Sequence, residues 1–158
     1  MPTLPLIAPG GQEKKNFKTE GVLMPLFEWS EKFSVNIAAC DEQHKCLIEL
    51  LNTLHAAMKQ GKGRDVISGV LNELADYTVY HFKTEEDLFR KHGYHGFDNH
   101  KKEHDDLTNQ VMGFKNKFEQ GQAALTIELM KFLKDWLTDH ILESDNNYSL
   151  FLNSKGVV

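Results

Sequence analysis

Proline is confined to the beginning of the chain, and its absence afterwards limits the fold more than any other feature. The last proline is Pro25, and none occurs in the rest of the 158 residues. Proline breaks helices because it lacks an amide proton and clashes with the preceding turn. Glycines interrupt the proline-free stretch at Gly61 and Gly63, at Gly93 and Gly96, and at Gly121. The stretch is thereby divided into four segments, each long enough for a helix.

Apolar residues recur at steps of three and four in every segment, the spacing of a helix with one buried face. The clearest case follows Gly96 and comprises Phe97, His100, His104, Leu107, Val111, Phe114 and Phe118. Asp41 is a candidate N-cap for the first helix, and Asp98 or Asn99 for the third. Four amphipathic segments joined by short loops predict an all-α fold, an up-down-up-down antiparallel four-helix bundle.

The first part of the chain differs from the rest. Residues 1–25 hold all the prolines and show no helical pattern, so we expect a short, flexible N-terminal extension before a bundle domain at 26–158. Residues 1–23 are expected to play no part in a functional site. They lack the basic leader and long apolar core of a secretory signal.

Composition limits the class of partner. The formal net charge is −5, which argues against nucleic acid, and no apolar run approaches the roughly 20 residues of a membrane span. Cys40 and Cys46 are the only cysteines and make a poor disulfide framework, so both are expected to be packing residues in a cytoplasmic protein. We expect a monomer that binds neither nucleic acid nor membrane.

Five histidines occupy positions where the helical spacing demands apolar residues: His44, His81, His100, His104 and His140. One such histidine is usually a core residue with a satisfied hydrogen bond. Five would each need a buried partner, which is costly. In an antiparallel bundle the starts of the first and third helices meet the ends of the second and fourth. The histidines should therefore converge at one end of the interior, where a metal could satisfy them all.

Carboxylates accompany these histidines. Glu85 follows His81 by four residues and so shares its helix face. Five nitrogen donors exceed the needs of one tetrahedral zinc, but with bridging carboxylates they suit two octahedral transition ions such as iron. The second carboxylate is ambiguous. Glu143 follows His140 by three residues, whereas Asp145 follows it by five, about 140° around an ideal helix, so spacing alone favours Glu143.

The chain resembles the hemerythrin family, in particular the single-domain bacterial hemerythrins. The resemblance extends from about Phe27 to Tyr148 and rests on FEWSEKFSVNIAACDEQHKCL, YHFKTEE, GFDNHKKEHDDL and DWLTDHILESD, in that order. It implies reversible dioxygen binding, as carrier, store or delivery protein, at a non-haem di-iron centre rather than enzymatic turnover. An oxygen-consuming protein is a candidate partner.

The resemblance also implies a ligand set. One iron would take His100, His104 and His140, and the other would take His44 and His81 with a position left open for dioxygen. Glu85 and Asp145 would bridge both irons together with an oxygen from solvent. Following the family at Asp145 predicts a local departure from ideal helix geometry after His140. The resemblance further places Leu47, Phe82, Trp136 and Leu137 in an apolar dioxygen pocket, although a core-packing role alone would also explain them.

Two other functions remain open. A di-iron redox enzyme could act on iron, peroxide or nitric oxide, although ferritin-like oxidases carry Glu-x-x-His pairs and about four carboxylates. An oxygen or iron sensor would need a separate signalling partner. The remaining histidines, His55, His92 and His95, are expected to pack or to lie in a loop. The acids of TEEDLFRK and HKKEHDD other than Glu85 are expected mostly on a solvated face.

Overall fold

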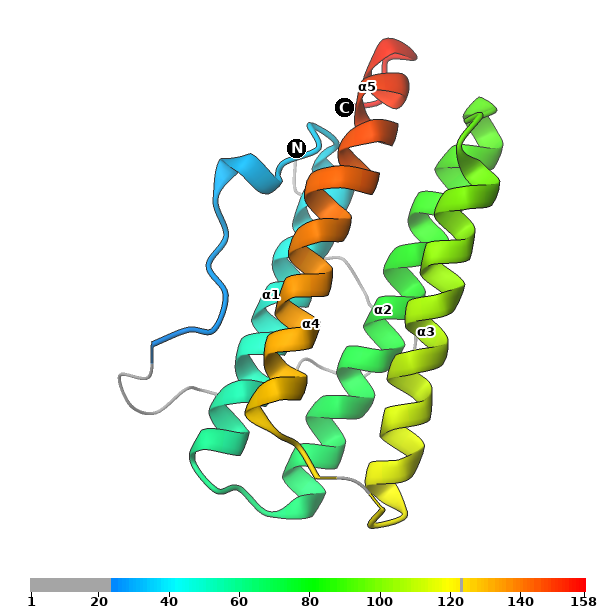
Figure 1. Cartoon of the computed structure of the whole chain (residues 1–158). Coiled ribbons are helices and arrows are strands. Elements are labelled where there is room, and N and C mark those ends of the chain that lie inside the picture. Colours follow the sequence, from blue (N-terminus) through cyan, green and yellow to red (C-terminus); the bar gives the residue numbers. More distant parts are fainter. Residues whose placement is uncertain (1–23, 123) are drawn as a thin grey trace, which may run out of the picture.

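The computed structural model describes residues 24–122 and 124–158, and all regular secondary structure in these ranges is helical. Consecutive long helices run in opposite directions, which confirms the predicted four-helix bundle (Figure 1). The expectations for residues 1–23 lie outside the described residues. The helices are α1 Ala38–Lys59, α2 Arg64–His92, α3 Phe97–Glu119 and α4 Ile127–Asp139, preceded by a 3₁₀ turn η1 Glu31–Phe33 and extended by a π-helical turn η2 His140–Asp145 and by α5 Asn146–Ser154.

The start of α1 differs from the predicted one. The helix begins at Ala38, so Asp41 lies within its first turn. The Asp41 carboxylate instead accepts hydrogen bonds from the Val35 amide at 2.8 Å and from the Ser34 hydroxyl at 2.5 Å. The N-cap prediction is wrong because this carboxylate stabilises the segment that leads into the helix.

The start of α3 was also predicted wrongly. The helix begins at Phe97, which places Asp98 and Asn99 inside its first turn. The preceding residue is Gly96, and a Cβ atom there would lie 2.7 Å from the ring of Tyr94. The buried tyrosine therefore requires glycine at the N-cap, and no side-chain cap is present.

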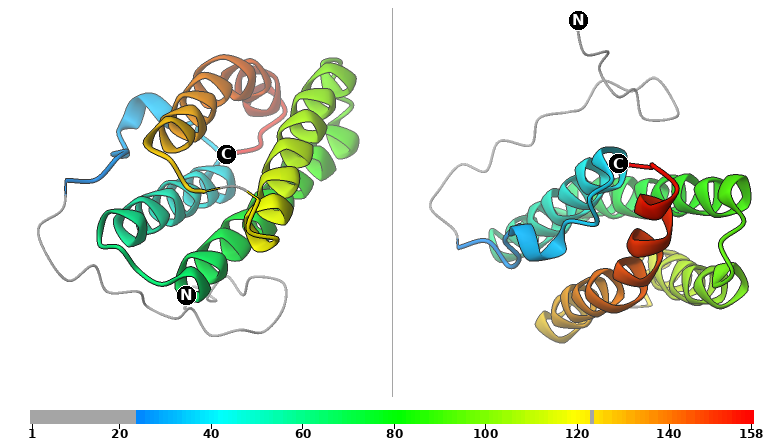
Figure 2. Two further views of the ribbon diagram at one scale, coloured as in Figure 1. Left: turned by 60° about the horizontal axis from the view of Figure 1, so that its bottom comes forward. Right: turned by 90° about the horizontal axis from the view of Figure 1, so that it is seen from above.

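The four long helices surround a common apolar interior (Figure 2). Its fully buried members include Leu54 of α1, Leu71 of α2 and Met130 of α4. Burying a side chain of this size stabilises the fold by about 1.5–3 kcal/mol. Cys40 is fully buried in a second apolar cluster, which confirms the packing role predicted for this cysteine.

The segment before α1 is fastened to the bundle. The Phe27 amide donates a hydrogen bond to Asn52 Oδ1 at 2.9 Å, and Asn52 Nδ2 donates one back to the Phe27 carbonyl at 2.7 Å. Phe27 and Phe33 are buried with their ring centroids 5.1 Å apart. Packing against the bundle therefore includes residues about ten positions before α1, along the blue stretch in Figure 1.

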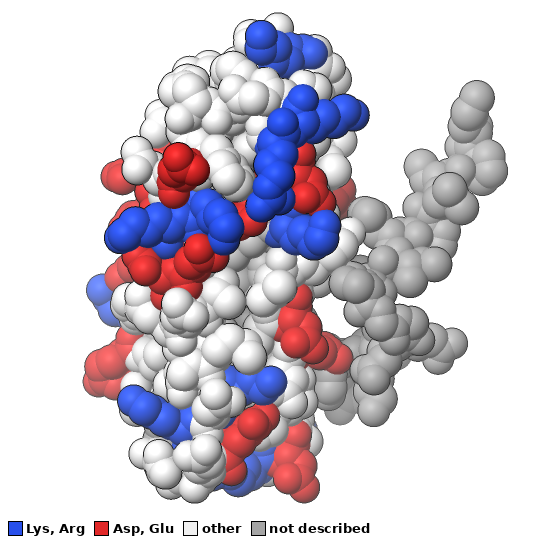
Figure 3. All heavy atoms as spheres, turned by 90° about the vertical axis from the view of Figure 1, so that its right-hand side faces the viewer, with Lys and Arg blue, Asp and Glu red and all other residues white. Residues whose placement is uncertain are grey.

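Charges of both signs alternate over the side of the molecule formed by α2 and α3 (Figure 3). Exposed lysine–aspartate pairs join residues four apart: Lys83 with Asp87, Lys101 with Asp105 and Lys102 with Asp106. Exposed pairs of this kind contribute about 0.3–0.5 kcal/mol each. In the described ranges, no helix combines the length and the apolar character needed to cross a bilayer.

Candidate metal centre

The five predicted histidines meet in the bundle interior, contributed by α1, α2, α3 and the first residue of η2. Each is at most 5% exposed. His44 and His81 form one pair, with ring centroids 4.6 Å apart. His100 lies 4.5 Å from His104 and 4.8 Å from His140, which makes a group of three. We call these the two-histidine group and the three-histidine group.

Glu85 of α2 lies between the groups and presents one oxygen to each. Its Oε1 is 3.1 Å from His81 Nε2 and 3.4 Å from His44 Nε2. Its Oε2 is 3.0 Å from His104 Nε2 and 3.6 Å from His100 Nε2. The carboxylate is fully buried and is placed to bridge two ions.

Asp145 at the end of η2 is arranged in the same way. Its Oδ2 lies 3.0 Å from His44 Nε2, and its Oδ1 lies 3.1 Å from both His100 Nε2 and His140 Nε2. It is also fully buried, whereas Glu143 is exposed. Spacing alone favoured Glu143, and this was wrong, because the side chain that reaches the cluster is that of Asp145.

A change in helix type explains how Asp145 reaches the interior. Residues His140–Asp145 form a π-helical turn, and the amide of Asn146 donates to the carbonyl of Ile141, five residues earlier. An i→i+5 turn brings residues five apart onto one face, which an α-helix does not. The predicted departure from ideal geometry after His140 is confirmed.

The outer ring nitrogens of three histidines donate to residues of the preceding helix. His81 Nδ1 lies 2.8 Å from Gln43 Oε1. The other two pairs join His104 Nδ1 to Glu86 Oε1 at 3.0 Å and His140 Nδ1 to Glu103 Oε2 at 2.9 Å. A proton held on Nδ1 leaves the lone pair on Nε2, which faces the interior.

The spacing of the sequence did not predict these three partners. Glu86 is largely buried, so its expected place on the solvated face is wrong, whereas Glu103 is exposed as expected and still accepts from His140. A signal for them does exist, because each is adjacent in sequence to an inner residue: Gln43 to His44, Glu86 to Glu85, and Glu103 to His104. Neighbours on a helix point about 100° apart, so a residue beside an inward ligand faces the adjacent helix.

Tyr148 of α5 was also missed. Its hydroxyl donates a hydrogen bond to Glu85 Oε1 at 2.6 Å, and both side chains are fully buried. The ring is held by Phe89, with centroids 5.0 Å apart. Burial, together with the charges of Glu85 and Asp145, raises the pKa of Tyr148 well above its usual value, so the hydroxyl keeps its proton and remains a donor.

The electrostatics of the cluster favour ionised carboxylates. Burial opposes charge, but the histidines outweigh it and hold the pKa values of Glu85 and Asp145 well below their usual range. Burial likewise opposes the charging of His44, yet Asp145 and Glu85 raise its pKa to about 9. Burial dominates at His81 and lowers its pKa.

The inner atoms of the cluster suit metal coordination. They lack hydrogen-bond partners in the described part of the chain although all are buried: Nε2 of His44, His100, His104 and His140, Oε2 of Glu85, and both carboxylate oxygens of Asp145. In each of two sets, which share both carboxylates, the candidate donor atoms lie within 4.8 Å of one another. Orphaned buried polar atoms are costly, and mixed imidazole and carboxylate donors are compatible with iron.

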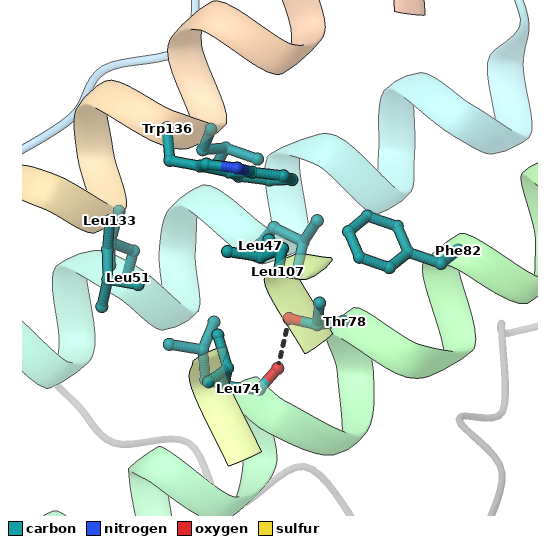
Figure 4. Close-up of a pocket in the computed structure, with 10 residues that line it drawn as sticks. Leu47, Leu51, Leu74, Thr78, Phe82, Leu107, Leu133 and Trp136 are labelled. Carbon is teal, nitrogen blue, oxygen red and sulfur yellow. Dashed lines mark hydrogen bonds between the residues drawn. The ribbon is translucent and has the colours of Figure 1, made fainter. Parts of the chain in front are cut away.

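An apolar cavity of about 40 Å³ lies between the helices of the bundle (Figure 4). All four residues predicted for an apolar pocket line it, namely Leu47, Phe82, Trp136 and Leu137. The cavity is also lined by residues that were not predicted for the pocket, including Leu51, Leu107 and Leu133.

Two aromatic side chains separate this cavity from the histidines. The Phe82 ring stacks on His104 with centroids 3.7 Å apart, and the Trp136 ring stacks on His140 at 4.6 Å. The hydroxyl of Thr78, also in the cavity wall, donates to the Leu74 carbonyl at 2.7 Å and so offers its proton to the backbone (Figure 4). The wall is therefore almost wholly apolar.

The remaining histidines stay outside the cluster, as predicted. His55 is half-buried along α1, and burial lowers its pKa. His92 ends α2, and His95 lies in the exposed loop that follows. None of these three histidines belongs to a metal-binding set in residues 24–122 and 124–158.

Comparisons with known proteins agree with this geometry. The sequence profile of the hemerythrin HHE cation binding domain matches residues 35–149. A bacteriohemerythrin of Methylococcus capsulatus (strain Bath) is 36% identical over 132 residues, covering 83% of this chain and 100% of that relative. A hemerythrin-like protein of Naegleria gruberi is 36% identical over 122 residues, covering 77% of this chain and 90% of that relative.

Solved structures show the same similarity. The crystal structure of a wild-type hemerythrin superposes with a TM-score of 0.77 at 37% identity, covering 80% of this chain and 98% of that one. The crystal structure of a hemerythrin point mutant superposes with a TM-score of 0.78 at 36% identity, covering 82% of this chain and 98% of that one. From the profile match, these relatives and the shared fold, the chain belongs to the hemerythrin family.

Proposed function

We propose that this protein binds dioxygen reversibly at a non-haem di-iron centre and serves as a carrier, store or delivery protein. The observation that carries the proposal is the pair of buried donor sets that share Glu85 and Asp145. Membership of the hemerythrin family supports it. The proposed ligands are His44 and His81 for one iron, His100, His104 and His140 for the other, and Glu85 and Asp145 for both.

The protein's own residues hold and orient the centre. Two ferrous ions bound there would supply the two electrons that reversible dioxygen binding requires. Gln43, Glu86 and Glu103 keep the proton of three imidazoles on Nδ1, so that Nε2 can coordinate. The two carboxylates supply negative charge that offsets the charge of the cations in a buried site.

The cavity wall excludes water from the centre. Leu47, Phe82, Trp136 and Leu137 form a largely apolar surface beside the histidines. Irreversible oxidation of the iron, in which the oxygen leaves in reduced form, requires protons and water. A dry wall therefore slows that loss and favours release of intact dioxygen. The near-saturated ligand shell leaves little room for an organic co-substrate, which favours binding over turnover.

The test combines elemental analysis with absorption spectra of the full chain under dioxygen and under vacuum. We expect two iron ions per chain and an oxygenated spectrum that bleaches on degassing. Immediate conversion to oxidised iron with catalytic turnover of peroxide or nitric oxide would favour the redox-enzyme alternative. Absence of iron from protein purified under anaerobic conditions and reconstituted would refute both.

A matched pair of variants connects the spectrum to the proposed ligands. Glu85→Gln weakens a donor shared by both groups, so both iron content and the oxygenated spectrum should fall. Glu73→Gln makes the same chemical change on the exposed side of α2 and should leave both unchanged. Equal effects of the two substitutions would contradict the assignment of Glu85.

We further propose that residues 26–158 form the binding domain and that residues 1–25 are an extension. The buried contacts of Phe27 support a start near this point. A chain that begins at Met24 should retain its iron content and dioxygen spectrum. A large loss of either would show that the earlier residues contribute to the centre.

A further inference from the structure

The two histidine groups differ in the charge of their outer hydrogen-bond partners. In the three-histidine group, two rings donate to carboxylates, His104 to Glu86 and His140 to Glu103. In the two-histidine group, His81 donates to the neutral amide of Gln43. The outer nitrogen of the other member, His44, is buried without a hydrogen-bond partner among the described residues.

These partners change how strongly each imidazole donates to a metal. A carboxylate that accepts the Nδ1 proton pushes electron density onto the ring and makes Nε2 a stronger ligand. An amide oxygen does this less, because it carries no net charge. Arg90 offsets part of the charge of Glu86, but its guanidinium is 3.7 Å away and half exposed, so solvent screens it.

Tyr148 adds to the difference through the shared carboxylate. Its hydroxyl donates to Oε1 of Glu85, the oxygen that faces His81 and His44. A short hydrogen bond to an ionised oxygen draws electron density from it. Oε2, which faces the three-histidine group, has no hydrogen-bond partner in the described residues and keeps its full donor strength.

We infer that the two subsites are graded, with the three-histidine group taking up a divalent first-row ion before the two-histidine group. The chain therefore passes through a one-ion form in which the second subsite is still to be filled. A chain with one ferrous ion can supply only one of the two electrons that dioxygen binding needs. The supply of metal therefore controls what fraction of the protein can bind dioxygen. This inference rests on the proposed di-iron function and deepens it.

The test is an anaerobic titration of the metal-free full chain with cobaltous ion, in which binding is measured by calorimetry. We expect two steps, each of one ion per chain. Glu86→Gln should weaken the first step by about tenfold or more, the usual effect of losing an outer partner, and leave the second nearly unchanged. Gln43→Glu should strengthen only the second step. Glu73→Gln is the matched control and should alter neither.

A spectroscopic readout identifies which group fills first. With one equivalent of cobaltous ion, the large contact shifts that require direct coordination of a ring should appear in the ring N–H protons of His104 and His140. Contact shifts of His44 and His81 should appear mainly with the second equivalent. This readout needs no substitution, so it decides the question even where a variant fails to fold.

Three results would overturn the inference. Contact shifts that appear in both groups together at one equivalent would show equal subsites. A first step weakened by a change at Gln43 rather than at Glu86 would reverse the order. In both of these outcomes, tight binding of two ions would leave the proposed function standing. The third result, failure to bind two ions, would refute the inference and the proposed function together.

Discussion

The π-helical turn at His140–Asp145 can be removed by deleting one exposed residue, Glu143. Such a turn contains one residue more than an α-helix needs, so the deletion should restore a continuous α-helix with the downstream face unchanged. In the shortened chain Asp145 becomes the fourth residue after His140. Four α-helical steps place it about 40° from His140, whereas five such steps would place it about 140° away.

The deletion should therefore be tolerated. Asp145 would still face the cluster, and the affinity for metal ions should fall by no more than about tenfold, a loss typical of imperfect orientation. Deletion of Asp135 is the matched control, since it removes an exposed acid from the α-helical part of the same rod. It turns His140 and all later residues by about 100° and should abolish binding of both ions.

The assay is metal content after anaerobic reconstitution, with circular dichroism to confirm that each shortened chain is helical. Near-complete retention of both ions without Glu143, and loss of them without Asp135, is the expected pattern. If removal of Glu143 strips the ions as thoroughly as removal of Asp135, the explanation of Asp145 by the π-helical turn is incorrect.

Three other perturbations probe the same region. Tyr148→Phe removes a buried donor and should lower the free energy of unfolding of the metal-free protein by about 1–3 kcal/mol in denaturant titrations. The control is Tyr80→Phe, the same change at a half-buried tyrosine of α2, and a loss no larger than that of the control would argue against the hydrogen bond. Phe82→Ala should cost about 3–5 kcal/mol in the same titration and speed oxidation of the iron-loaded protein, because it enlarges the cavity beside His104; unchanged oxidation would separate the cavity from water exclusion. Removal of metal by a chelator should leave helical circular dichroism intact, because the largest apolar cluster is built from side chains that are not among the proposed ligands. It should lower stability by about 4 kcal/mol for each of the two ions, about 8 kcal/mol in total, relative to protein at a thousandfold excess of free metal over Kd. A fully unfolded metal-free chain would contradict this.

The helices were predictable because their signal is local. The three- and four-residue spacing of Leu47, Leu51 and Leu54 shows a buried face whatever the helix packs against. Helix ends were less predictable. The role of Asp41 depends on hydrogen bonds to residues six and seven positions earlier, which capping preferences do not reveal.

The inner cluster was predictable for a different reason. Antiparallel topology alone brings His44, His81, His100, His104 and His140 to one end of the bundle, whatever the detailed rotation of each helix. Asp145 needed the family resemblance, since a π-helical turn leaves no mark in residue spacing. The partners of the outer nitrogens depend on how adjacent helices are rotated, and a single sequence does not state that rotation.

The hydrogen bonds from the outer histidine nitrogens each join consecutive helices along the chain. Gln43 ties α1 to α2, Glu86 ties α2 to α3, and Glu103 ties α3 to the rod that begins with α4. If α2 or α3 slipped by one turn, about 5.4 Å, it would lose its hydrogen bond to the helix on each side and withdraw its ligands at the same time. The alignment of the helices and the completeness of the ligand set therefore depend on the same contacts, and a misaligned chain would lack a complete metal site.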